Sequence, residues 1–361
     1  MSKKILIVID SLGSGGAQKQ AITLGIGLKK SGVEVSFFVY KKSDFFRKIL
    51  DEHNIKIYFE KKNGKLGFNV IFNLFKIVRR ENISHIISFL DTPNFYSSTV
   101  KFFNRGIKLI ISYRSTTHFD STNNTSLRLK KWCNNQADYI VSNSYHERDN
   151  WLIKFPELSE KWNVIYNGVS DSEFSPDSSI IRNDHFLVVG SVGPWKNGLA
   201  IIEAISILRN KGIIINLKWF GKKIALLQGY IKQMENLIKK ENLEDQWEWY
   251  KPSNQISAQY KKCKALILAS KTEGLPNVVC EALMCGTPCI VSDVLDHPKL
   301  IISEKNGYLF NPDDPETLAM KIEKMNTLSD SAYTEMSKNA HTNSSILFNV
   351  ESYINNFQKL L

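Results

Sequence analysis

Residues 273–289 hold the side chains of this chain best suited to chemistry. Two carboxylates, Glu273 and Glu281, stand eight positions apart, with Gly274 and Pro276 between them. Proline suits the first turn of a helix, where its missing N–H removes no hydrogen bond. The amides that follow point out of the helix end, where the helix dipole attracts an anion. The pattern predicts a turn that binds a diphosphate, with Glu281 one turn further in and paired to polar groups such as ribose hydroxyls.

Strand-like apolar runs flank this turn. Residues 265–269 precede it, and residues 288–292 follow the helix. Strand, loop, helix and strand together make a βαβ unit, whose ligand loop lies at the carboxyl end of the first strand. The segment expected to contact the ligand comprises Gly274, Leu275, Pro276, Asn277 and Val278.

Strand-like and helix-like segments alternate along the whole chain, which implies parallel sheets with helices on both faces. Residues 171–184 interrupt the alternation because they are rich in Ser, Asp and Pro and lack apolar periodicity, so they predict a linker. With 361 residues, the chain is long enough for two domains. We predict an α/β fold of two doubly wound domains facing across a cleft. The expected strands lie at 5–9, 34–39, 56–59, 85–89, 108–113, 139–142 and 163–166, then at 186–191, 216–220, 246–250, 265–269, 288–292 and 307–310.

Composition places the chain among ordinary globular proteins, with 43% hydrophobic and 23% charged residues. Its first residues contain only five apolar positions before Asp10, too few for a signal peptide, and no run reaches the length of a membrane span. The five cysteines show neither a Cys-x-x-Cys pair nor clustering with histidine, so they predict buried thiols in a reducing compartment rather than a metal site. We therefore expect a cytoplasmic protein.

Positive charge is concentrated in the first half of the chain. Residues 1–168 hold 26 Lys and Arg against 14 Asp and Glu, a balance of +12, whereas the remainder is −1. A basic face can attract anionic lipids at roughly 1 kcal/mol per residue, bind nucleic acid through phosphates, or simply keep the protein soluble. No nucleic-acid-binding motif accompanies it, so we expect an anionic membrane surface as the partner. The basic clusters are Lys41-Lys42, Lys61-Lys62, Arg79-Arg80 and Lys130-Lys131.

The stretch 273–289 resembles the donor-binding signature of retaining glycosyltransferases of family four, which have the two-domain GT-B fold. Further segments resemble the family in the same order along most of the chain, namely 13–18, 164–169, 189–197 and 306–310 followed by Asp313-Asp314. The resemblance implies an acceptor-binding domain at 1–168, a nucleotide-sugar-binding domain at 169–343, and a final helix at 344–361 that returns to the first domain. The Asp313-Asp314 pair is interpreted as a helix cap rather than a metal site.

The resemblance also assigns roles. Glu273 resembles the residue that accepts hydrogen bonds from the transferred sugar, and Glu281 the residue that holds the ribose. Lys196 follows a strand, so its ammonium can reach the diphosphate. Neither carboxylate is expected to be a nucleophile, because retention in this family is generally explained by front-side attack, with the donor phosphate taking the acceptor proton. Lys196 and helix amides would stabilise the leaving diphosphate, so we expect no metal and no cofactor.

One position departs from the family pattern. An arginine usually stands five residues before the lysine, and here that position is Ser191. A hydroxyl cannot copy the planar, bidentate phosphate donor. Another cation must take its place or diphosphate binding is weaker, and the candidate substitutes are Lys222, Lys223 and Arg114.

Gly15 and Gly16 follow the first strand and could let the backbone approach the donor diphosphate or the acceptor closely. The dinucleotide pattern Gly-x-Gly-x-x-Gly fails at Gln18, and no acidic residue ends the second strand. A nicotinamide-dependent dehydrogenase is therefore disfavoured, and these glycines remain candidates for donor binding.

Three residues of the first domain are candidates for the reaction site. Arg114 closes the strand 108–113 and resembles a position held by His or Arg in related transferases, which favours a catalytic role. Asp91 follows another strand and could contact an acceptor hydroxyl or cap a helix. His118 is a further candidate for acceptor binding, although loop histidines commonly lack such a role.

These features predict a retaining glycosyltransferase that moves a sugar from a nucleoside-diphosphate donor, most readily a uridine-linked one. The expected acceptor is a lipid-linked or polysaccharide glycan of O-antigen or capsule synthesis, met at the inner face of the cytoplasmic membrane. A nucleotide-sugar epimerase or phosphorylase of the same architecture is an alternative. A non-catalytic protein that binds nucleotide-sugar or nucleic acid is another.

Overall fold

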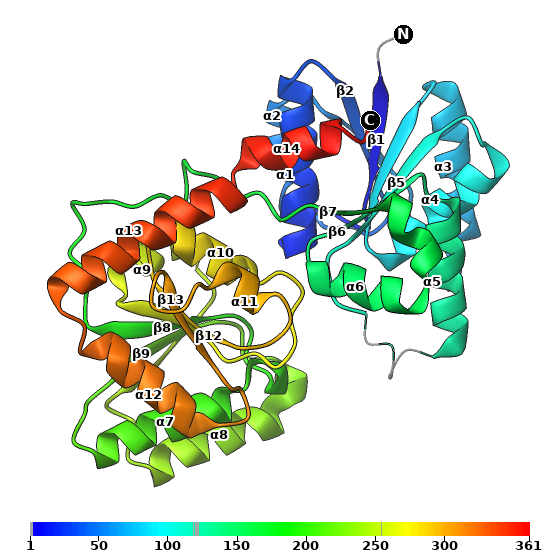
Figure 1. The fold of residues 1–361 in the computed structure, drawn as a ribbon. Helices are drawn as coiled ribbons and strands as arrows, with labels where there is room; N and C mark the ends of the chain where they lie inside the picture. Colours follow the sequence, from blue (N-terminus) through cyan, green and yellow to red (C-terminus); the bar gives the residue numbers. More distant parts are fainter. Residues whose placement is uncertain (1–2, 118, 120–122, 254) are drawn as a thin grey trace. The chain divides into compact units, whose positions relative to one another are not determined.

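The computed structural model describes residues 3–117, 119, 123–253 and 255–361. The chain divides into two compact units (Figure 1). Unit 1 comprises Met1–Gly168 and Val350–Leu361, and unit 2 comprises Val169–Asn349.

Unit 1 is built on a parallel sheet with strand order β3-β2-β1-β4-β5-β6-β7. Its inner strands are mostly apolar and buried because both faces of the sheet are covered. Ile5 and Ile7 of β1 enter one hydrophobic cluster, and Leu6 and Val8 of the same strand enter another on the opposite face. The strands are β1 (Lys4–Val8), β2 (Glu34–Val39), β3 (Lys56–Phe59), β4 (His85–Phe89), β5 (Lys108–Tyr113), β6 (Tyr139–Ser142) and β7 (Trp162–Val164).

Helices cover both faces of the unit 1 sheet (Figure 1). One cluster is completed by α1 (Gly16–Lys30), α2 (Arg47–Glu52) and α14 (Val350–Gln358). The other is completed by α3 (Phe68–Arg80), α4 (Asp91–Phe103), α5 (Asn124–Gln136), α6 (Tyr145–Lys154) and the short 3₁₀ helix η1 (Pro156–Lys161). The last helix, α14, packs on α1 at Gly27, where an added Cβ would lie 2.0 Å from Ile354.

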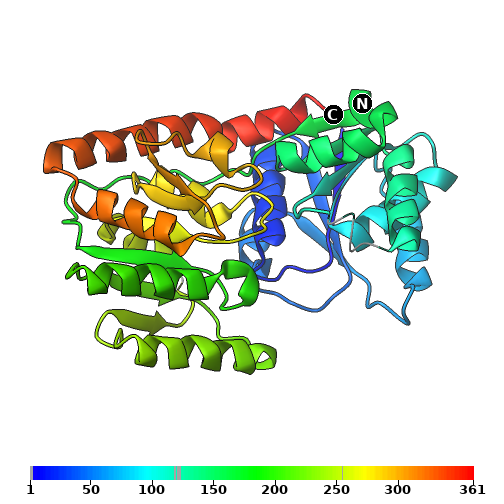
Figure 2. The same cartoon turned by 60° about the horizontal axis from the view of Figure 1, so that its bottom comes forward.

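Unit 2 has a second parallel sheet, with strand order β10-β9-β8-β11-β12-β13. Figure 2 shows α13 and the α9–α10 region on one side of this sheet and α7 and α8 on the other. Its strands are β8 (His185–Val189), β9 (Asn216–Phe220), β10 (Trp247–Tyr250), β11 (Ala265–Leu268), β12 (Cys289–Ser292) and β13 (Gly307–Phe310). Its helices are η2 (Pro194–Lys196), α7 (Gly198–Asn210), η3 (Ala225–Leu227), α8 (Gln228–Lys240), α9 (Ile256–Lys262), α10 (Asn277–Met284), α11 (His297–Leu300), α12 (Pro315–Asn326) and α13 (Asp330–Leu347).

The segment expected as a linker, 171–184, contains no strand or α-helix. It is nevertheless fastened to unit 2 by Arg182, whose guanidinium donates to the carbonyls of Tyr260, Cys263, Cys285 and Gly286 and to the Thr287 hydroxyl at 2.9–3.2 Å. This planar donor can serve several acceptors at once, which a lysine could not copy.

The final helix begins later than its apolar pattern predicts. Residues 344–347 end α13 in unit 2, and the helix that joins unit 1 starts at Val350. Both helices are amphipathic, so periodicity alone does not show the break between them. The cap predicted at Asp313-Asp314 is present, because the Asp314 carboxylate accepts hydrogen bonds from the backbone of Glu316 and Thr317.

Candidate active site

The candidate site lies at the carboxyl edge of the unit 2 sheet. Strands β8 and β11 are paired in parallel, so the loops that follow them leave the sheet side by side. A hydrogen bond from the backbone N–H of Lys271 to the carbonyl of Trp195, at 3.2 Å, ties the two loops together. Residues 77 positions apart in sequence therefore share one surface.

Lys196 and Glu273 form an ion pair on this surface. The Lys196 Nζ lies 2.5 Å from the Glu273 Oε1, and the two side chains are only 12% and 21% exposed. The Ser270 hydroxyl donates to the same carboxylate oxygen at 2.9 Å. Little water reaches the pair, so its electrostatic interaction is stronger than that of a surface pair.

A glycine makes room for the lysine. Gly190 has a φ of +143°, and an added Cβ would lie 2.8 Å from the Lys196 Cε. Any other residue at this position would meet both a strained backbone and the lysine stem. The loop after β8 is thus shaped to bring the ammonium against Glu273.

The helix α10 begins beside this pair, with one difference from the sequence prediction. Pro276 is the N-cap residue, with φ −75° and ψ 98°, rather than a residue of the first turn. Its carbonyl accepts a hydrogen bond from the Val279 N–H at 3.0 Å, so that amide does not face outward as expected. Asn277 and Val278 are the first two residues of the helix and are half-buried. The positive end of the dipole lies at these two residues. The loop before the helix also contains Gly274 and the buried Leu275.

Glu281 lies one turn further along α10 and contacts Tyr260 of α9. The Tyr260 hydroxyl donates to the Glu281 Oε2 at 3.2 Å, and the tyrosine ring is fully buried. Burial, together with the nearby Glu281 carboxylate, raises the pKa of Tyr260 well above its usual value, so the hydroxyl keeps its proton. The sequence shows that Glu281 needs a polar partner but gives no sign that this tyrosine supplies one.

A histidine that sequence reasoning missed extends the network. The His297 Nδ1 lies 2.8 Å from the Ser292 carbonyl, and the Ser292 hydroxyl donates to the Ser270 carbonyl at 2.6 Å. Burial lowers the pKa of His297, which favours the neutral ring with its proton on Nδ1. Leu295, two residues earlier, has a left-handed φ of +54°, which is uncommon for leucine. Backbone strain of this kind leaves no signal in the sequence.

Contacts near Ser191 bear on which cation could replace the arginine expected at that position. The adjacent Val192 N–H donates to the Lys222 carbonyl at 3.0 Å, so the loops after β8 and β9 run together. Lys223 is engaged, because its Nζ lies 2.6 Å from the Glu235 carboxylate and 4.6 Å from the centre of the Trp249 ring. Of the two lysines among the candidate substitutes, Lys222 is therefore the better placed. A cavity of about 440 Å³ opens beside them, lined by residues 221–223 and 249–252.

Arg114 lies in unit 1 and is packed among aromatic rings. Its Nη1 donates to the Asn167 side chain at 2.8 Å, and its guanidinium lies 5.2–5.8 Å from the rings of Phe89, Tyr353 and Phe357. The Nε and Nη2 atoms are shielded from solvent and have no hydrogen-bond partner among the described residues. Burial lowers the pKa of Arg114. These contacts give it a structural role in seating α14, and its catalytic role stays a prediction.

The remaining candidates also belong to unit 1. Gly15 is the N-cap of α1 and Gly16 its first residue. Asp91 begins α4 rather than capping it, because Leu90 is the N-cap residue, and its carboxylate pairs with Lys130 at 2.9 Å. His118 lies outside the described residues. The structure thus brings together Lys196, Glu273 and the start of α10, and leaves the roles of the unit 1 residues untested.

Comparison with known proteins decides the family. The family model "Glycosyltransferase Family 4" matches residues 14–173, and "Glycosyl transferases group 1" matches residues 173–343. The chain belongs to glycosyltransferase family 4. The predicted family and the two-domain GT-B fold are therefore confirmed, and the protein is a glycosyltransferase.

Relatives and solved structures resemble this family 4 glycosyltransferase over most of its length. It is 28% identical over 337 residues, 89% of this chain and 88% of the relative, to the GalNAc-alpha-(1->4)-GalNAc-alpha-(1->3)-diNAcBac-PP-undecaprenol alpha-1,4-N-acetyl-D-galactosaminyltransferase of Campylobacter jejuni. It is 26% identical, over 55% of this chain and 54% of the relative, to the UDP-Gal:alpha-D-GlcNAc-diphosphoundecaprenol alpha-1,3-galactosyltransferase of Escherichia coli. The structure of Anabaena Alr3699/HepE in complex with UDP superposes with a TM-score of 0.85 at 19% identity, covering 99% of this chain and 98% of that one.

Proposed function

We propose that this glycosyltransferase transfers a sugar from a UDP-sugar to a lipid-linked or polysaccharide acceptor, with retention of configuration and without a metal. The observation that carries the proposal is the half-buried Lys196–Glu273 pair beside the first turn of α10. A cation, a carboxylate and a helix N-terminus in one place suit a sugar joined to a diphosphate.

The chemistry follows from how these charges would be used. Lys196 and the amides of Asn277 and Val278 would stabilise the negative charge that collects on the leaving diphosphate. Glu273 would accept hydrogen bonds from the sugar hydroxyls. The acceptor oxygen bonds to the anomeric carbon as the bond to the phosphate oxygen breaks. The acceptor proton passes to the leaving diphosphate, so Glu273 need not act as a nucleophile.

The nucleoside would extend from the diphosphate towards Glu281 and the loops after β9 and β10. Glu281, held by Tyr260, would accept hydrogen bonds from the ribose hydroxyls. The cavity at residues 249–252 offers an aromatic wall for a base, since Tyr250 stacks on Phe220 with ring centres 4.6 Å apart. Uridine is proposed because the Escherichia coli relative is named for a UDP-sugar and the Anabaena structure holds UDP.

The acceptor is proposed from the names of the relatives. Both the Campylobacter jejuni and the Escherichia coli enzymes are named for glycans linked to undecaprenol through a diphosphate. We extend this acceptor class to the present chain and place its reaction in the synthesis of a surface glycan. An acceptor of this kind resides in a membrane.

Peripheral attachment to an anionic membrane is proposed from a surface of unit 1. On α3, Phe68 and Phe72 are 71% and 60% exposed, and Leu66 just before the helix is 57% exposed. Lys76 lies one turn beyond, with its Nζ 4.3 Å from the centre of the Phe72 ring. Aromatic residues flanked by cations suit the interface of an anionic bilayer. No helix in the described part of the chain is long and apolar enough to span one.

A donor screen tests the proposed reaction. The protein is incubated with each of a panel of nucleotide-sugars, with and without a short diphospholipid-linked glycan, and the released nucleoside diphosphate is measured. We expect release that depends on both a UDP-sugar and the acceptor. Conversion of the donor without acceptor would instead favour an epimerase, and phosphate-dependent release would favour a phosphorylase. Lack of binding to UDP in calorimetry would reject the donor assignment itself.

A further inference from the structure

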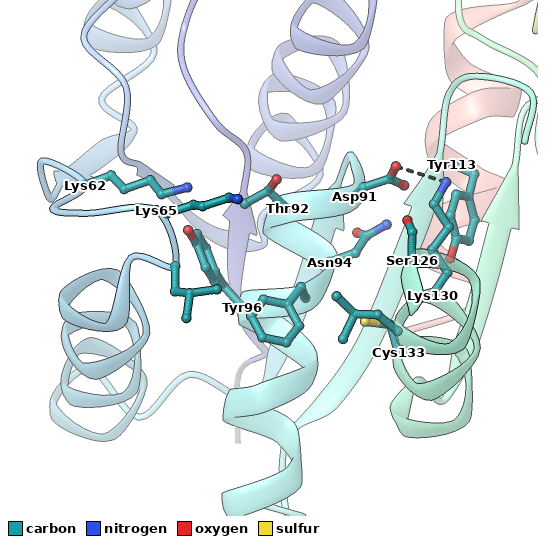
Figure 3. A pocket seen from close by; sticks show the side chains of 13 residues that line it. Lys62, Lys65, Asp91, Thr92, Asn94, Tyr96, Tyr113, Ser126, Lys130 and Cys133 are labelled. Carbon is teal, nitrogen blue, oxygen red and sulfur yellow. Dashed lines mark ion pairs between the residues drawn. The ribbon is translucent and has the colours of Figure 1, made fainter. Parts of the chain in front are cut away.

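A cavity of about 300 Å³ in unit 1 has no role in the site described above. It opens between α4, α5 and the segment that joins β3 to α3 (Figure 3). Its wall combines hydroxyl, amide and ammonium groups with apolar side chains, so it suits an amphiphilic ligand. The lining residues that the argument uses are Lys62, Lys65, Leu66, Asp91, Tyr96 and Lys130.

The charge of this cavity is positive. Lys62 and Lys65 approach from one side and Lys130 from the other (Figure 3), and Asp91 is the only carboxylate among the lining residues. The Asp91 carboxylate is neutralised by Lys130, whose Nζ lies 2.9 Å away. Two ammonium groups are left in excess, which favours an anionic ligand.

A buried hydroxyl in the wall provides an independent indication. Tyr96 is 1% exposed, and its hydroxyl has no hydrogen-bond partner among the described residues. Leaving a hydroxyl buried and unpaired costs on the order of 1–3 kcal/mol, which a phenylalanine would avoid while filling the same space. Gly67, at φ +66°, packs against this hydroxyl, because a Cβ there would lie 2.5 Å from it. The hydroxyl is thus a donor without an acceptor among the described residues, in a wall that Lys62 and Lys65 also line.

We propose that this cavity binds the phosphate-bearing head of a lipid-linked acceptor, with the Tyr96 hydroxyl, Lys62 and Lys65 as its donors. The inference rests on the proposed function for the identity of the ligand, but the site is defined by unit 1 alone. Leu66 lines the cavity, and the exposed residues Phe68 and Phe72 follow it closely in sequence. These side chains would contact the hydrocarbon chain of the lipid. The ligand is therefore a diphosphate joined to an isoprenoid, not a free anion.

Calorimetry with farnesyl diphosphate, farnesol and inorganic pyrophosphate tests this assignment. The titrations use the full chain with UDP at saturation, so that the donor site is occupied. We expect wild type to bind farnesyl diphosphate at least tenfold more tightly than either pyrophosphate or farnesol. The Lys62→Gln/Lys65→Gln variant should bind it at least tenfold more weakly, and Tyr96→Phe about tenfold more weakly.

A matched control separates local from overall charge. Lys30→Gln/Lys48→Gln removes the same charge from exposed residues outside the cavity and should change the affinity less than twofold. Equal weakening in both double variants would overturn the site, as would farnesyl diphosphate binding that UDP abolishes in wild type. Pyrophosphate binding as tight as that of farnesyl diphosphate would overturn the lipid as ligand.

The stability of Tyr96→Phe provides a second readout. Because the hydroxyl has no partner among the described residues, its removal should leave the free energy of unfolding unchanged or higher. A destabilised variant with normal farnesyl diphosphate affinity would assign the hydroxyl to structure and overturn the proposal. Binding of UDP in the same calorimeter reports on the donor site separately, so the two proposals fail independently.

Discussion

The two charged sites of this molecule differ in how their polar groups are satisfied without a ligand. In unit 2, Lys196 and Glu273 neutralise one another, and the Ser270 hydroxyl donates a hydrogen bond to the Glu273 carboxylate. In unit 1, the lysines of the cavity outnumber its carboxylates, and the Tyr96 hydroxyl has no partner in the described chain. The first site is held in place by its own side chains, so a donor that binds there as proposed would have to exchange those contacts for its own. The second site is incomplete, so a ligand adds contacts without breaking any in the chain.

The largest expected effect comes from removing one partner of the Lys196–Glu273 ion pair. Lys196→Met should lower kcat/KM at least 100-fold, because it removes charge stabilisation of the leaving diphosphate and leaves Glu273 without its ion-pair partner. Nucleotide release under single-turnover conditions measures the loss. Lys271→Met is a control on the adjacent loop, since its ammonium pairs with Asp313 on the surface and should matter little. Equal loss in both variants would show that loop stability, not the Lys196–Glu273 pair, governs transfer.

The next largest effect distinguishes the proposed roles of Glu281 and Glu273. Glu281→Ala should weaken UDP binding about tenfold or more, because it removes the acceptor proposed for the ribose hydroxyls. Glu273→Ala should change UDP affinity by less than threefold while impairing transfer, because its ligand is the sugar. Calorimetry with UDP compares them, and an equal loss of affinity in both would remove the proposed division of roles. Tyr260→Phe should fall between wild type and Glu281→Ala, since it leaves the carboxylate but not its positioning hydrogen bond.

Much of this architecture is predictable from local pattern. The strands are short apolar runs between turn residues, and every expected strand is present with ends shifted by at most two residues. The Asp314 cap and the start of α10 are likewise encoded by a few adjacent residues. Lys196 and Glu273 each lie in a loop that follows a strand of the same sheet, which is where ligands of α/β sheets lie, so their place at one edge of the sheet could be predicted from sequence.

The groups that sequence reasoning missed depend on distant partners. Tyr260 and Glu281 lie 21 positions apart on different helices, and nothing local to either shows that they meet. The cavity around Tyr96 needs three separate segments to converge. In α3 the apolar residues exceed one helical face, so periodicity does not show that Val70 and Leu74 enter the core while Phe68 and Phe72 remain outside.

The exposed apolar side chains of α3 allow a separate test of membrane attachment by unit 1, with a smaller expected effect. Phe68→Ala/Phe72→Ala should reduce co-sedimentation with vesicles containing anionic phospholipid about threefold to tenfold, at unchanged net charge. Phe103→Ala/Ile153→Ala removes equally exposed apolar groups elsewhere in unit 1 and serves as the control. If both variants lose the same amount, the attachment is generally hydrophobic and the proposed surface is wrong. A soluble acceptor should be turned over normally by either variant, because neither alters the lining of the cavity or the donor site.

The smallest effect compares two buried histidines, each at the start of a strand. His85 in unit 1 has partners for both ring nitrogens, at the Ser84 hydroxyl and the Leu361 carbonyl, whereas the His185 Nε2 has none among the described residues. Burial, and then the nearby Lys218, lower the pKa of His185 to about 4, and burial lowers that of His85. The unfolded chain then binds more protons than the folded one, so stability is lost as pH falls from about 6.5 towards 4. In urea unfolding at pH 7 and pH 5, His185→Gln should reduce the loss by about 1 kcal/mol, after allowance for solvent screening. His85→Gln should reduce this loss of unfolding free energy less than His185→Gln does. The reverse order would mean that the two hydrogen bonds of the His85 ring do not support its charged form.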